Sequence, residues 1–493
     1  MGLRSRLLKA LGFKFKEKSR HSRRSYAGAV INRLSADWIS QSTSADAEIK
    51  TSLKRLRDRS RQLVRDNPFA RQAKRLVQLN VIGNGVRLQS QVMNARGNRR
   101  DSRANQLIES KWEYWCREQF CDVAGRHGFD DFAWLAAGAL PESGEILFRL
   151  HRQPYGGSKV PLALEIIEAD VLDPEYSGPV LGEGHEWRMG VECDSHNKPV
   201  RYAFFNRHPG DYWFQGSHKA NVRHELVLAE DVIHLFIPER PLQSRGVTWF
   251  ASVMTDIHQL DGYVSAAVTR ARAAASLMGF VTTDAGEITN HEDVENGERI
   301  SDWSPGQFHY LDSGQQITFP QFDSPDAQFD DFVKSNVRRF ASGFGCSYNH
   351  LSKDFSDSNY SSSRLSLLED RDHWKMVQKY MIQHFYMRVF REWLELAVLS
   401  NELPFSDYEL RPERYDNPKW LPRGWSWVDP MKEAQAYAIM EDRGYMTKAQ
   451  ICSQLGTDLG ENIEQIAREK KMQEEAGLNL YSEAAFLDDE DDS

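Results

Sequence analysis

Cysteine is scarce in this sequence and does not form a recognisable set. The chain has five cysteines in 493 residues, widely scattered and without a Cys-x-x-Cys pair. An odd number of distant thiols fits neither a disulfide framework nor a zinc cage. We therefore expect reduced, mostly buried thiols.

Long apolar runs are also missing. No window approaches the roughly 18 consecutive apolar residues of a membrane span. The N-terminus is basic and amphipathic from Leu3 to Phe15, but Lys9 interrupts its short apolar run and no small-residue cleavage site follows. A secretory signal fits this pattern poorly, so the sequence predicts a cytoplasmic origin with no membrane partner.

Catalytic signatures are absent as well. The sequence has no Walker loop, HExxH, GxSxG or kinase motif. The Gly-x-Gly at Gly83 and Gly85 leads into a predicted strand rather than a helix, so it indicates a turn and not a pyrophosphate site. The Ser-rich stretch 357–364 offers hydroxyls without an adjacent base. We predict no catalytic residue, no cofactor and no metal.

Two alternatives from other functional classes stay open. A metal-dependent nuclease could use imidazole and carboxylate ligands, although their spacing matches no ligand motif and a structural role is the preferred interpretation of His234. The residues concerned are His224, His234, His258, Asp231, Asp256 and Asp261. The second alternative is a monomeric nucleic-acid-binding module built on the basic first hundred residues.

What the chain does have is apolar area and a steep charge gradient. Its 493 residues, of which 40% are hydrophobic and 11% aromatic, predict a folded protein with more than one structural unit. Residues 1–100 hold 24 Lys+Arg against 6 Asp+Glu, which gives them a net charge of +18. Because the whole chain has a net charge of −9, residues 101–493 carry −27. A basic arm seeks phosphate or acidic protein, whereas an acidic body repels nucleic acid.

Residue periodicity in the first half predicts an α+β fold. Helical spacing covers residues 45–79, broken at Asn67-Pro68, and two further helices are expected at 105–120 and 130–140. Four strand-like runs separated by turn residues follow, at 145–151, 162–168, 200–206 and 232–237.

The second half begins with the longest helical pattern, residues 248–277, whose latter part is rich in small side chains. Such a surface lets neighbouring helices approach closely, and we expect Ala266, Ala267, Arg270, Ala271, Arg272 and Ala274 to pack there. A β excursion follows, with a strand at 279–283, an acidic loop at 285–302 and a hairpin of 307–311 with 316–319. A returning helix at 325–340 completes the outline of a protruding stem with a tip.

The remaining chain is predicted to be mostly helical. A polar stretch at 351–363 precedes a long amphipathic helix at 364–399, and residues 404–430 form a connector. Short helices are expected at 431–442, 447–454 and 462–471, before an acidic tail. The chain has no repeat of fixed period.

Six short segments, in this order, resemble the lambda-like family of phage portal proteins. They are residues 56–67 (LRDRSRQLVRDN), 81–88 (VIGNGVRL), 167–170 (IEAD), 240–247 (RPLQSRGV), 359–364 (NYSSSR) and 427–434 (WVDPMKEA). Each is weak alone, but their joint order is specific, and together they extend over most of residues 30–440.

This resemblance implies a multi-region portal fold that closes into a cyclic ring, typically a dodecamer, around a DNA-wide channel. The expected regions are a basic flexible arm (1–25), a wing (26–246), a first stem helix (247–278), a small β clip (279–323) and a second stem helix (324–345). A tunnel loop (346–363), a long helix and connector of the wing (364–430), a helical crown (431–480) and an acidic tail (481–493) follow.

The resemblance also implies a function without catalysis. Double-stranded DNA would pass the tunnel-loop residues Lys353, Asp354, Ser356, Asp357, Ser358 and Asn359 during packaging and ejection. Implied partners are terminase, major capsid or scaffold protein, and head-tail connector proteins, in the virion and earlier in the host cytoplasm. The basic arm and the acidic tail match nothing specific in the family.

Overall fold

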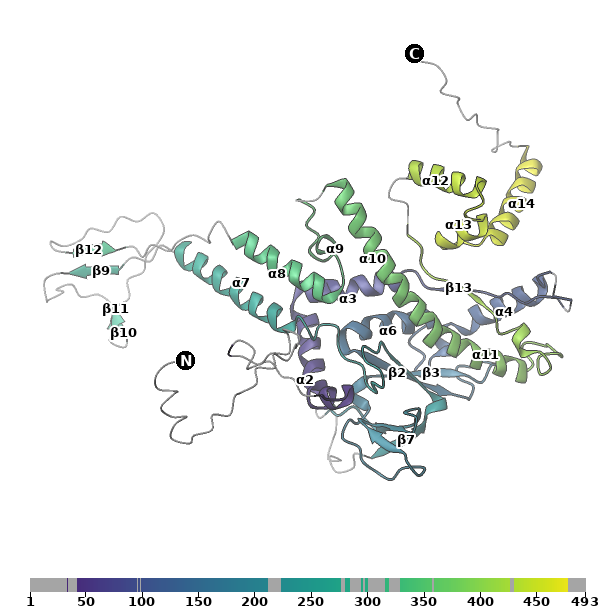
Figure 1. Ribbon diagram of the computed structural model, residues 1–493, viewed down its shortest axis with the longest axis horizontal. Helices are drawn as coiled ribbons and strands as arrows, with labels where there is room; N and C mark the ends of the chain where they lie inside the picture. Colours follow the sequence, from purple (N-terminus) through teal and green to yellow (C-terminus); the bar gives the residue numbers. More distant parts are fainter. Residues whose placement is uncertain are drawn as a thin grey trace, which may run out of the picture. The chain divides into compact units, whose positions relative to one another are not determined.

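The computed structural model describes most of the chain between residues 42 and 477 (Figure 1). The described residues are 33, 42–94, 96–97, 99–211, 223–275, 280–283, 294–295, 298–299, 315–318, 329–356, 359–425 and 430–477. The predicted basic arm at 1–25, the acidic tail at 481–493, and Asp357 and Ser358 of the loop lie outside them.

Two helices open the described part, and they confirm the predicted break. Helix α2 (Ala45–Asp66) and helix α3 (Pro68–Val81) are separated only by Asn67. The Asn67 side chain accepts a hydrogen bond from the backbone amide of Ala70 at 2.9 Å, and Pro68 occupies the first helical position. Both features favour a helix start, so the sequence sets this boundary locally.

The next helical stretch differs from its prediction. The single helix expected at 105–120 is two helices, α4 (Ser102–Trp115) and α5 (Glu118–Cys121), because Arg117 has an extended backbone. Helix α6 (Phe129–Ser143) agrees with its prediction and ends at Gly144, whose φ of 85° places it in the left-handed region that favours glycine.

Two antiparallel sheets carry the centre of the fold. The first has the order β3-β2-β8, from β2 (Glu145–His151), β3 (Ala163–Ile167) and β8 (Val232–Phe236). The second has the order β4-β5-β6-β7, from β4 (Glu186–Arg188), β5 (Val191–Cys193), β6 (Pro199–Phe205) and β7 (His224–Leu228). The four predicted strands are confirmed to within one residue at each end, whereas β4, β5 and β7 were not predicted.

A pair of long helices follows the sheets. Helix α7 (Met254–Ala275) lies against helix α8 (Phe329–Phe344), with the ring of Tyr263 stacked on that of Phe329 at 5.7 Å (Figure 1). Helix α7 begins six residues later than predicted, because the residues just before Met254 form turns. The predicted helix, β excursion and returning helix are all present.

The excursion between the two helices contains a strand pair that the sequence did not predict. Strand β9 (Phe280–Thr283) pairs with β12 (Gln315–Thr318), and the predicted pairing of 316–319 with 307–311 stays a prediction because 307–311 lies outside the described residues. The expected acidic loop contains a short antiparallel pair, β10 (Val294–Glu295) with β11 (Glu298–Arg299).

The predicted loop at 346–363 is shorter in the structure. Helix α9 (Tyr348–Ser352) lies near its start and helix α10 (Tyr360–Met381) begins before its end, so residues 346–347, 353–356 and 359 are the ones described as non-helical. Asn359 caps α10 by accepting a hydrogen bond from the amide of Ser362 at 2.8 Å. A π-helical turn, η4 (Ile382–Tyr386), continues into α11 (Met387–Leu399).

The last elements return to the start of the fold. Strand β13 (Lys419–Leu421) pairs with β1 (Arg87–Gln89), so the connector meets the turn at Gly83 and Gly85. Three helices follow: α12 (Pro430–Asp442), α13 (Lys448–Gln454) and α14 (Leu459–Ala476). Short 3-10 turns lie at Ala169–Val171 (η2), Ala229–Asp231 (η3) and Pro412–Arg414 (η5).

The main core is aromatic and links elements far apart in sequence. The indole of Trp112 on α4 lies 5.2 Å from that of Trp393 on α11 and 5.8 Å from that of Trp420 on β13. All five cysteines are free thiols. Among the described helices, none has the length and apolarity needed to cross a bilayer.

Candidate functional site

A buried carboxylate lies where the sheets meet the start of the long helix pair. Glu145, the first residue of β2, is about 1% exposed. The guanidinium of Arg245 donates to both its oxygens, at 2.6 to 3.0 Å, and Arg57 of α2 donates to Oε1 at 2.6 Å. The Nε2 atom of His234 on β8 and the amide of Gly246 lie 2.9 and 2.8 Å from Oε2. Six hydrogen-bond contacts from four residues therefore converge on one side chain.

The electrostatics of this group follow from its burial. Burial alone would raise the pKa of Glu145, but Arg245, the hydrogen bond with His234, and Arg57 outweigh it, so the pKa is well below its usual range. Burial lowers the pKa of His234 against the opposing pull of Glu145. A neutral His234 that donates its Nε2 proton to the Glu145 carboxylate is consistent with the lowered pKa of each group.

The carboxylate of Asp170 balances part of the positive charge of Arg57. Arg57 lies 3.4 Å from Asp170, whose other oxygen is 2.5 Å from Arg61. Burial would raise the pKa of Asp170, but Arg57 and Arg61 outweigh it and lower the pKa. We call Arg57, Glu145, Asp170, His234 and Arg245 the ionic junction. Removing one partner from such a buried group leaves an uncompensated charge.

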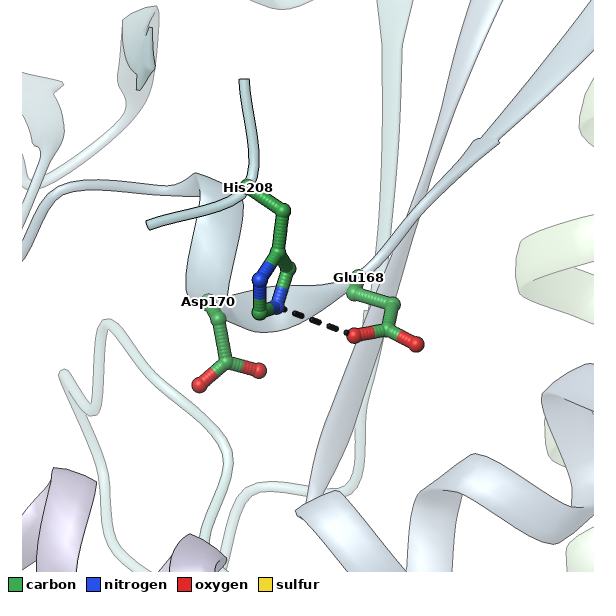
Figure 2. A group of neighbouring side chains, drawn as sticks. All are labelled: Glu168, Asp170 and His208. Atoms are coloured by element: carbon green, nitrogen blue, oxygen red, sulfur yellow. Dashed lines mark ion pairs between the residues drawn. The ribbon is translucent and has the colours of Figure 1, made fainter. Parts of the chain in front are cut away.

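Next to the ionic junction, three side chains lie close enough together to share a metal ion. Within the described part of the chain, this is the one such group. Figure 2 shows Glu168, Asp170 and His208, with the Nε2 atom of His208 at 3.2 Å from Glu168. However, Arg61 lies 2.5 Å from Asp170 and 3.7 Å from Glu168. Because Arg61 pairs with both carboxylates and Arg57 also pairs with Asp170, the arrangement fits an ion-pair cluster better than a cation site.

Three of the six sequence segments described above converge at this place. Residues 56–67 supply Arg57, residues 167–170 supply Asp170, and residues 240–247 supply Arg245. The junction therefore joins α2, the first sheet and the chain that leads into α7. Sequence reasoning selected these segments but missed Glu145, which lies 88 residues from Arg57 and 100 from Arg245.

Two glycines permit the close backbone approach beside Glu145. A Cβ atom placed on Gly144 would lie 2.3 Å from the carbonyl carbon of Val247, and one on Gly246 would lie 2.2 Å from the carbonyl oxygen of Gly144. Since real side chains do not tolerate such distances, glycine is required on both sides of this contact.

The histidines and aspartates of the nuclease alternative are each engaged separately. His224 contacts Asp173 at 2.8 Å, His234 contacts Glu145, and Asp231 pairs with Arg152. Asp256 pairs with Arg339 at 2.9 Å, and Asp261 accepts from Asn67 at 2.8 Å. Asp66, His258 and Asp261 line a cavity of about 410 Å³ between α2 and α7, but they are not among the described side chains that lie close enough together to share an ion. The structural interpretation of His234 is confirmed.

In the described part of the predicted tunnel loop, hydrogen bonds from nearby residues hold the carboxylate of Asp354 in place. Lys353 is exposed and ends α9 with a φ of 61°. Asp354 accepts hydrogen bonds from the hydroxyl of Ser356 at 2.6 Å, its amide at 3.0 Å and the Tyr348 hydroxyl at 2.9 Å. These bonds lower the pKa of Asp354 to about 2. Asp354 therefore shapes its own turn, while Lys353 and Ser356 face solvent.

Both ends of this loop are tied together by Asp370 of α10. Its carboxylate accepts from the amide of Ser347 at 2.9 Å and from the Ser347 hydroxyl at 2.7 Å, and it lies 2.5 Å from Nδ1 of His350. Ser347 also approaches Nδ1 of His350, at 2.8 Å. Because serine and aspartate meet the same ring nitrogen, this trio lacks the relay geometry of a hydrolase. It anchors α9 to α10, and sequence reasoning missed it.

The residues predicted for stem packing lie on α7 with most of their side chains uncovered. Ala267 is buried, whereas Ala266, Arg270, Ala271 and Arg272 are exposed. Ala274 lies in the same helix, and its side chain is outside the described part. The small-residue surface is therefore available on the single chain.

Comparison with known proteins decides the family. The model of the family "Phage portal protein, lambda family" matches residues 32–378. The chain belongs to the lambda family of phage portal proteins. A probable portal protein of Halomonas phage phiHAP-1 is 31% identical over 475 residues, covering 94% of this chain and 89% of that protein.

Two more distant portal proteins cover a similar share. Portal proteins of Escherichia phages N15 and lambda are 24% and 23% identical, each covering 91% of this chain and 90% of the relative. Among solved structures, the neck of an empty gene transfer agent (GTA) particle shares 13% identity at a TM-score of 0.43, covering 83% of this chain and 94% of the other. The portal assignment rests on the family and the relatives, and the nuclease alternative is not supported.

Proposed function

We propose that this portal protein closes with copies of itself into a ring, typically of twelve, through which double-stranded DNA is packaged and later ejected. The family match carries this proposal, and the exposed small-residue surface of α7 supports it. A cyclic ring needs two different surfaces on each subunit, and small side chains let helices from neighbouring copies approach closely. The ring would stand at one capsid vertex of the virion, after assembly in the host cytoplasm.

The regions of the portal fold are assigned to elements on the same basis. Helices α7 and α8 form the stem, the strand pairs between them belong to the clip, and the sheets with α2 to α6 form the wing. Helices α12 to α14 form the crown. The ionic junction then lies where wing meets stem and fixes their connection through Arg245 and Glu145.

The channel is proposed to work by weak contact. Residues 101–493 carry −27, so an acidic lining would leave DNA most of its counterions and hold no phosphate for long. The residues at 353–359 would touch the moving duplex, with exposed Lys353 as the one basic side chain among them. Translocation would then meet little friction.

The external partners are proposed from the same family. The clip would bind the terminase motor during packaging and head-tail connector proteins afterwards, while capsid or scaffold protein would hold the ring in the shell. Electron microscopy of the purified protein, alone and co-expressed with capsid and scaffold proteins, tests the ring. Annular particles are expected, and their absence under every assembly condition would overturn the proposal.

A second experiment tests the absence of catalysis. The chain has no phosphate-binding loop, so the purified protein should hydrolyse no ATP above the rate of a buffer control, with or without DNA. Turnover that co-purifies with the ring and persists after the terminase is removed would contradict a purely structural role.

A further inference from the structure

A short turn between β1 and α4 presents four arginines at the surface. All four are exposed, and they fall within eight residues: Arg96, Arg99, Arg100 and Arg103. Among the residues that the structure describes, no carboxylate forms an ion pair with any of them. We call these four residues the arginine turn. Its charge makes it a binding surface for an anion.

The fold beneath the arginine turn holds its backbone in one shape. The amide of Asn94 donates to the carbonyl of Arg99 at 2.8 Å, which closes the turn. The buried side chain of Asn105 on α4 accepts from the amide of Val92 at 2.7 Å and donates to its carbonyl at 3.2 Å. Because this backbone is already ordered, binding an anion here costs only the ordering of side chains.

The one carboxylate within this stretch is engaged inside the fold. Asp101 caps α4 by accepting from the amide of Ala104 at 3.1 Å, and it pairs with Arg414 at 3.3 Å. Arg414 also pairs with Asp407 at 2.7 Å and donates to the carbonyl of Met93 at 2.6 Å. Asp101 therefore serves Arg414 and the helix start. The positive end of the α4 dipole lies at the same place and strengthens the attraction for an anion.

Helix α14, which precedes an acidic segment, begins beside the arginine turn. A Cβ atom placed on Gly460, at the start of α14, would lie 3.8 Å from Nη1 of Arg100. The 18 residues of α14 make it about 27 Å long, at about 1.5 Å per residue. The ten residues 478–487 can span about 33 Å when extended. The chain that follows Gly477 is therefore long enough to return along α14 to Arg100.

The composition of residues 478–493 complements the arginine turn. This segment holds six Asp+Glu and no Lys or Arg, and five of the acidic residues are consecutive at 488–492. We call these five residues the acidic run. Arginine is suited to such a partner because its planar guanidinium can donate two parallel hydrogen bonds to one carboxylate.

Apolar side chains favour this segment over DNA as the occupant of the arginine turn. Ile463 and Ile466 of α14 are 57% and 43% exposed, and Phe486 and Leu487 directly precede the acidic run. A segment that returns along α14 brings these apolar residues past one another, whereas a phosphate backbone has no such groups. Covalent attachment also gives the segment an effective concentration on the order of millimolar, which free DNA lacks.

We propose that the acidic run 488–492 binds the arginine turn of its own chain. Its carboxylates then take the places that DNA phosphates would otherwise occupy, so the segment keeps duplex DNA off this part of the surface. The contact lies within one chain, and it is therefore tested on the unassembled protein, independently of ring formation.

A fluorescent peptide with the sequence of residues 478–493 serves as the probe. In the full-length chain, the acidic run is neutralised by Asp488→Asn, Asp489→Asn, Glu490→Gln, Asp491→Asn and Asp492→Asn. This neutral-tail chain should bind the peptide at least about tenfold more tightly than the unchanged chain, whose own acidic run competes. Fluorescence anisotropy measures the affinity, which should fall as salt is added because exposed ion pairs are screened.

Substitution of the arginines locates the site. In the neutral-tail chain, replacing all four residues of the arginine turn with Gln should weaken peptide binding by at least about tenfold. The circular dichroism spectrum should stay unchanged, because the four side chains are exposed. A matched control removes the same charge from exposed positions of α2 and α3, and should bind the peptide like the neutral-tail chain: Lys54→Gln, Arg55→Gln, Arg59→Gln and Arg75→Gln.

Three results would overturn the inference. Equal binding, or no binding, of the peptide by the neutral-tail and unchanged chains would mean that the acidic run does not occupy the arginine turn. Undiminished binding after loss of the four arginines would place the acidic run elsewhere, such as on the basic residues 1–25. A short DNA duplex whose binding needs the four arginines, when peptide binding does not, would assign the turn to DNA.

Discussion

At the scale of single residues, Glu145 has the most contacts to lose. Replacing it with Gln keeps its shape but removes the charge that holds Arg57 and Arg245 in the interior. Because a buried charge left without its partner is costly, Glu145→Gln should lower the free energy of unfolding by about 3–5 kcal/mol. Urea denaturation of the unassembled chain measures the change.

A matched substitution gives the baseline for that loss. Glu183 is an exposed glutamate outside the junction, and Glu183→Gln should stay within about 0.5 kcal/mol of the unchanged chain. A loss below about 1 kcal/mol for Glu145→Gln would mean that the junction adds little net stability, as some buried ion pairs do.

The same residues predict how stability depends on pH. The pKa of Glu145 is lowered in the fold, so its stabilisation is complete above the ordinary value of about 4.3 and is lost as the pH falls below it. Burial also lowers the pKa of His234, so the unfolded chain takes up that proton first, below about pH 6.5. Both groups therefore destabilise the fold in acid.

The expected loss of stability at acid pH has two parts, and the Glu145→Gln variant separates them. Urea midpoints measured from pH 8 to 3 should decline gently below about 6.5 and steeply below about 4.3. In Glu145→Gln the steeper part should shrink, because a glutamine takes up no proton. Identical acid limbs in both proteins would contradict the assignment of that part to Glu145.

At the scale of elements, the loop between α9 and α10 is predicted to touch DNA without building the ring. Joint replacement of Lys353, Asp354 and Asp357 with Ala should leave ring assembly intact and impair packaging or retention of DNA. Asp354 bonds within its own turn and to Tyr348, and it lies 4.0 Å from Lys334 of α8, so its loss alters the loop and its edge and not the main core. Asp372→Ala, an exposed carboxylate on α10, is the control.

Packaged DNA length and its retention after heating report this result. Loss of rings in the triple variant would mean that the loop is structural. Normal packaging and retention of DNA would mean that residues 353–359 do not line the channel.

Sequence periodicity predicts the elements that are long or that carry their own boundary signals. Asn67-Pro68 divides α2 from α3 as expected, since the cap and the fixed proline backbone are local. The break at Arg117 has no proline or glycine, so nothing in the pattern revealed it. Strands of three residues such as β4 and β5 are too short to show alternation.

Long-range pairing could not be predicted for the same physical reason. The pairing of β12 with β9 joins residues separated by more than 30 positions, whereas the sequence favoured the nearest partner. The ionic junction likewise depends on which distant segments the sheets bring together. Arg57, Asp170 and Arg245 stood in segments chosen by resemblance. Glu145, the shared partner of Arg57 and Arg245, opens a strand whose sequence shows only its alternation.

At the scale of the whole molecule, the charge gradient separates two tasks. Residues 1–25 hold nine Lys+Arg and one Glu, while the body from residue 101 onward is strongly acidic. A basic segment binds DNA or an acidic protein surface, whereas the acidic body should neither hold nor slow DNA. We therefore expect attachment and passage to be carried out by different parts of one chain.

Deleting residues 1–25 tests this separation. Rings should still form, because the proposed contact between copies lies on α7, whereas incorporation of rings into heads should fall. DNA binding by the purified ring should weaken and lose most of its salt dependence, since the deletion removes nine cationic side chains. If the truncated ring binds DNA as tightly and with the same salt slope, the body itself grips the duplex. An acidic channel with low friction would then no longer explain how DNA passes.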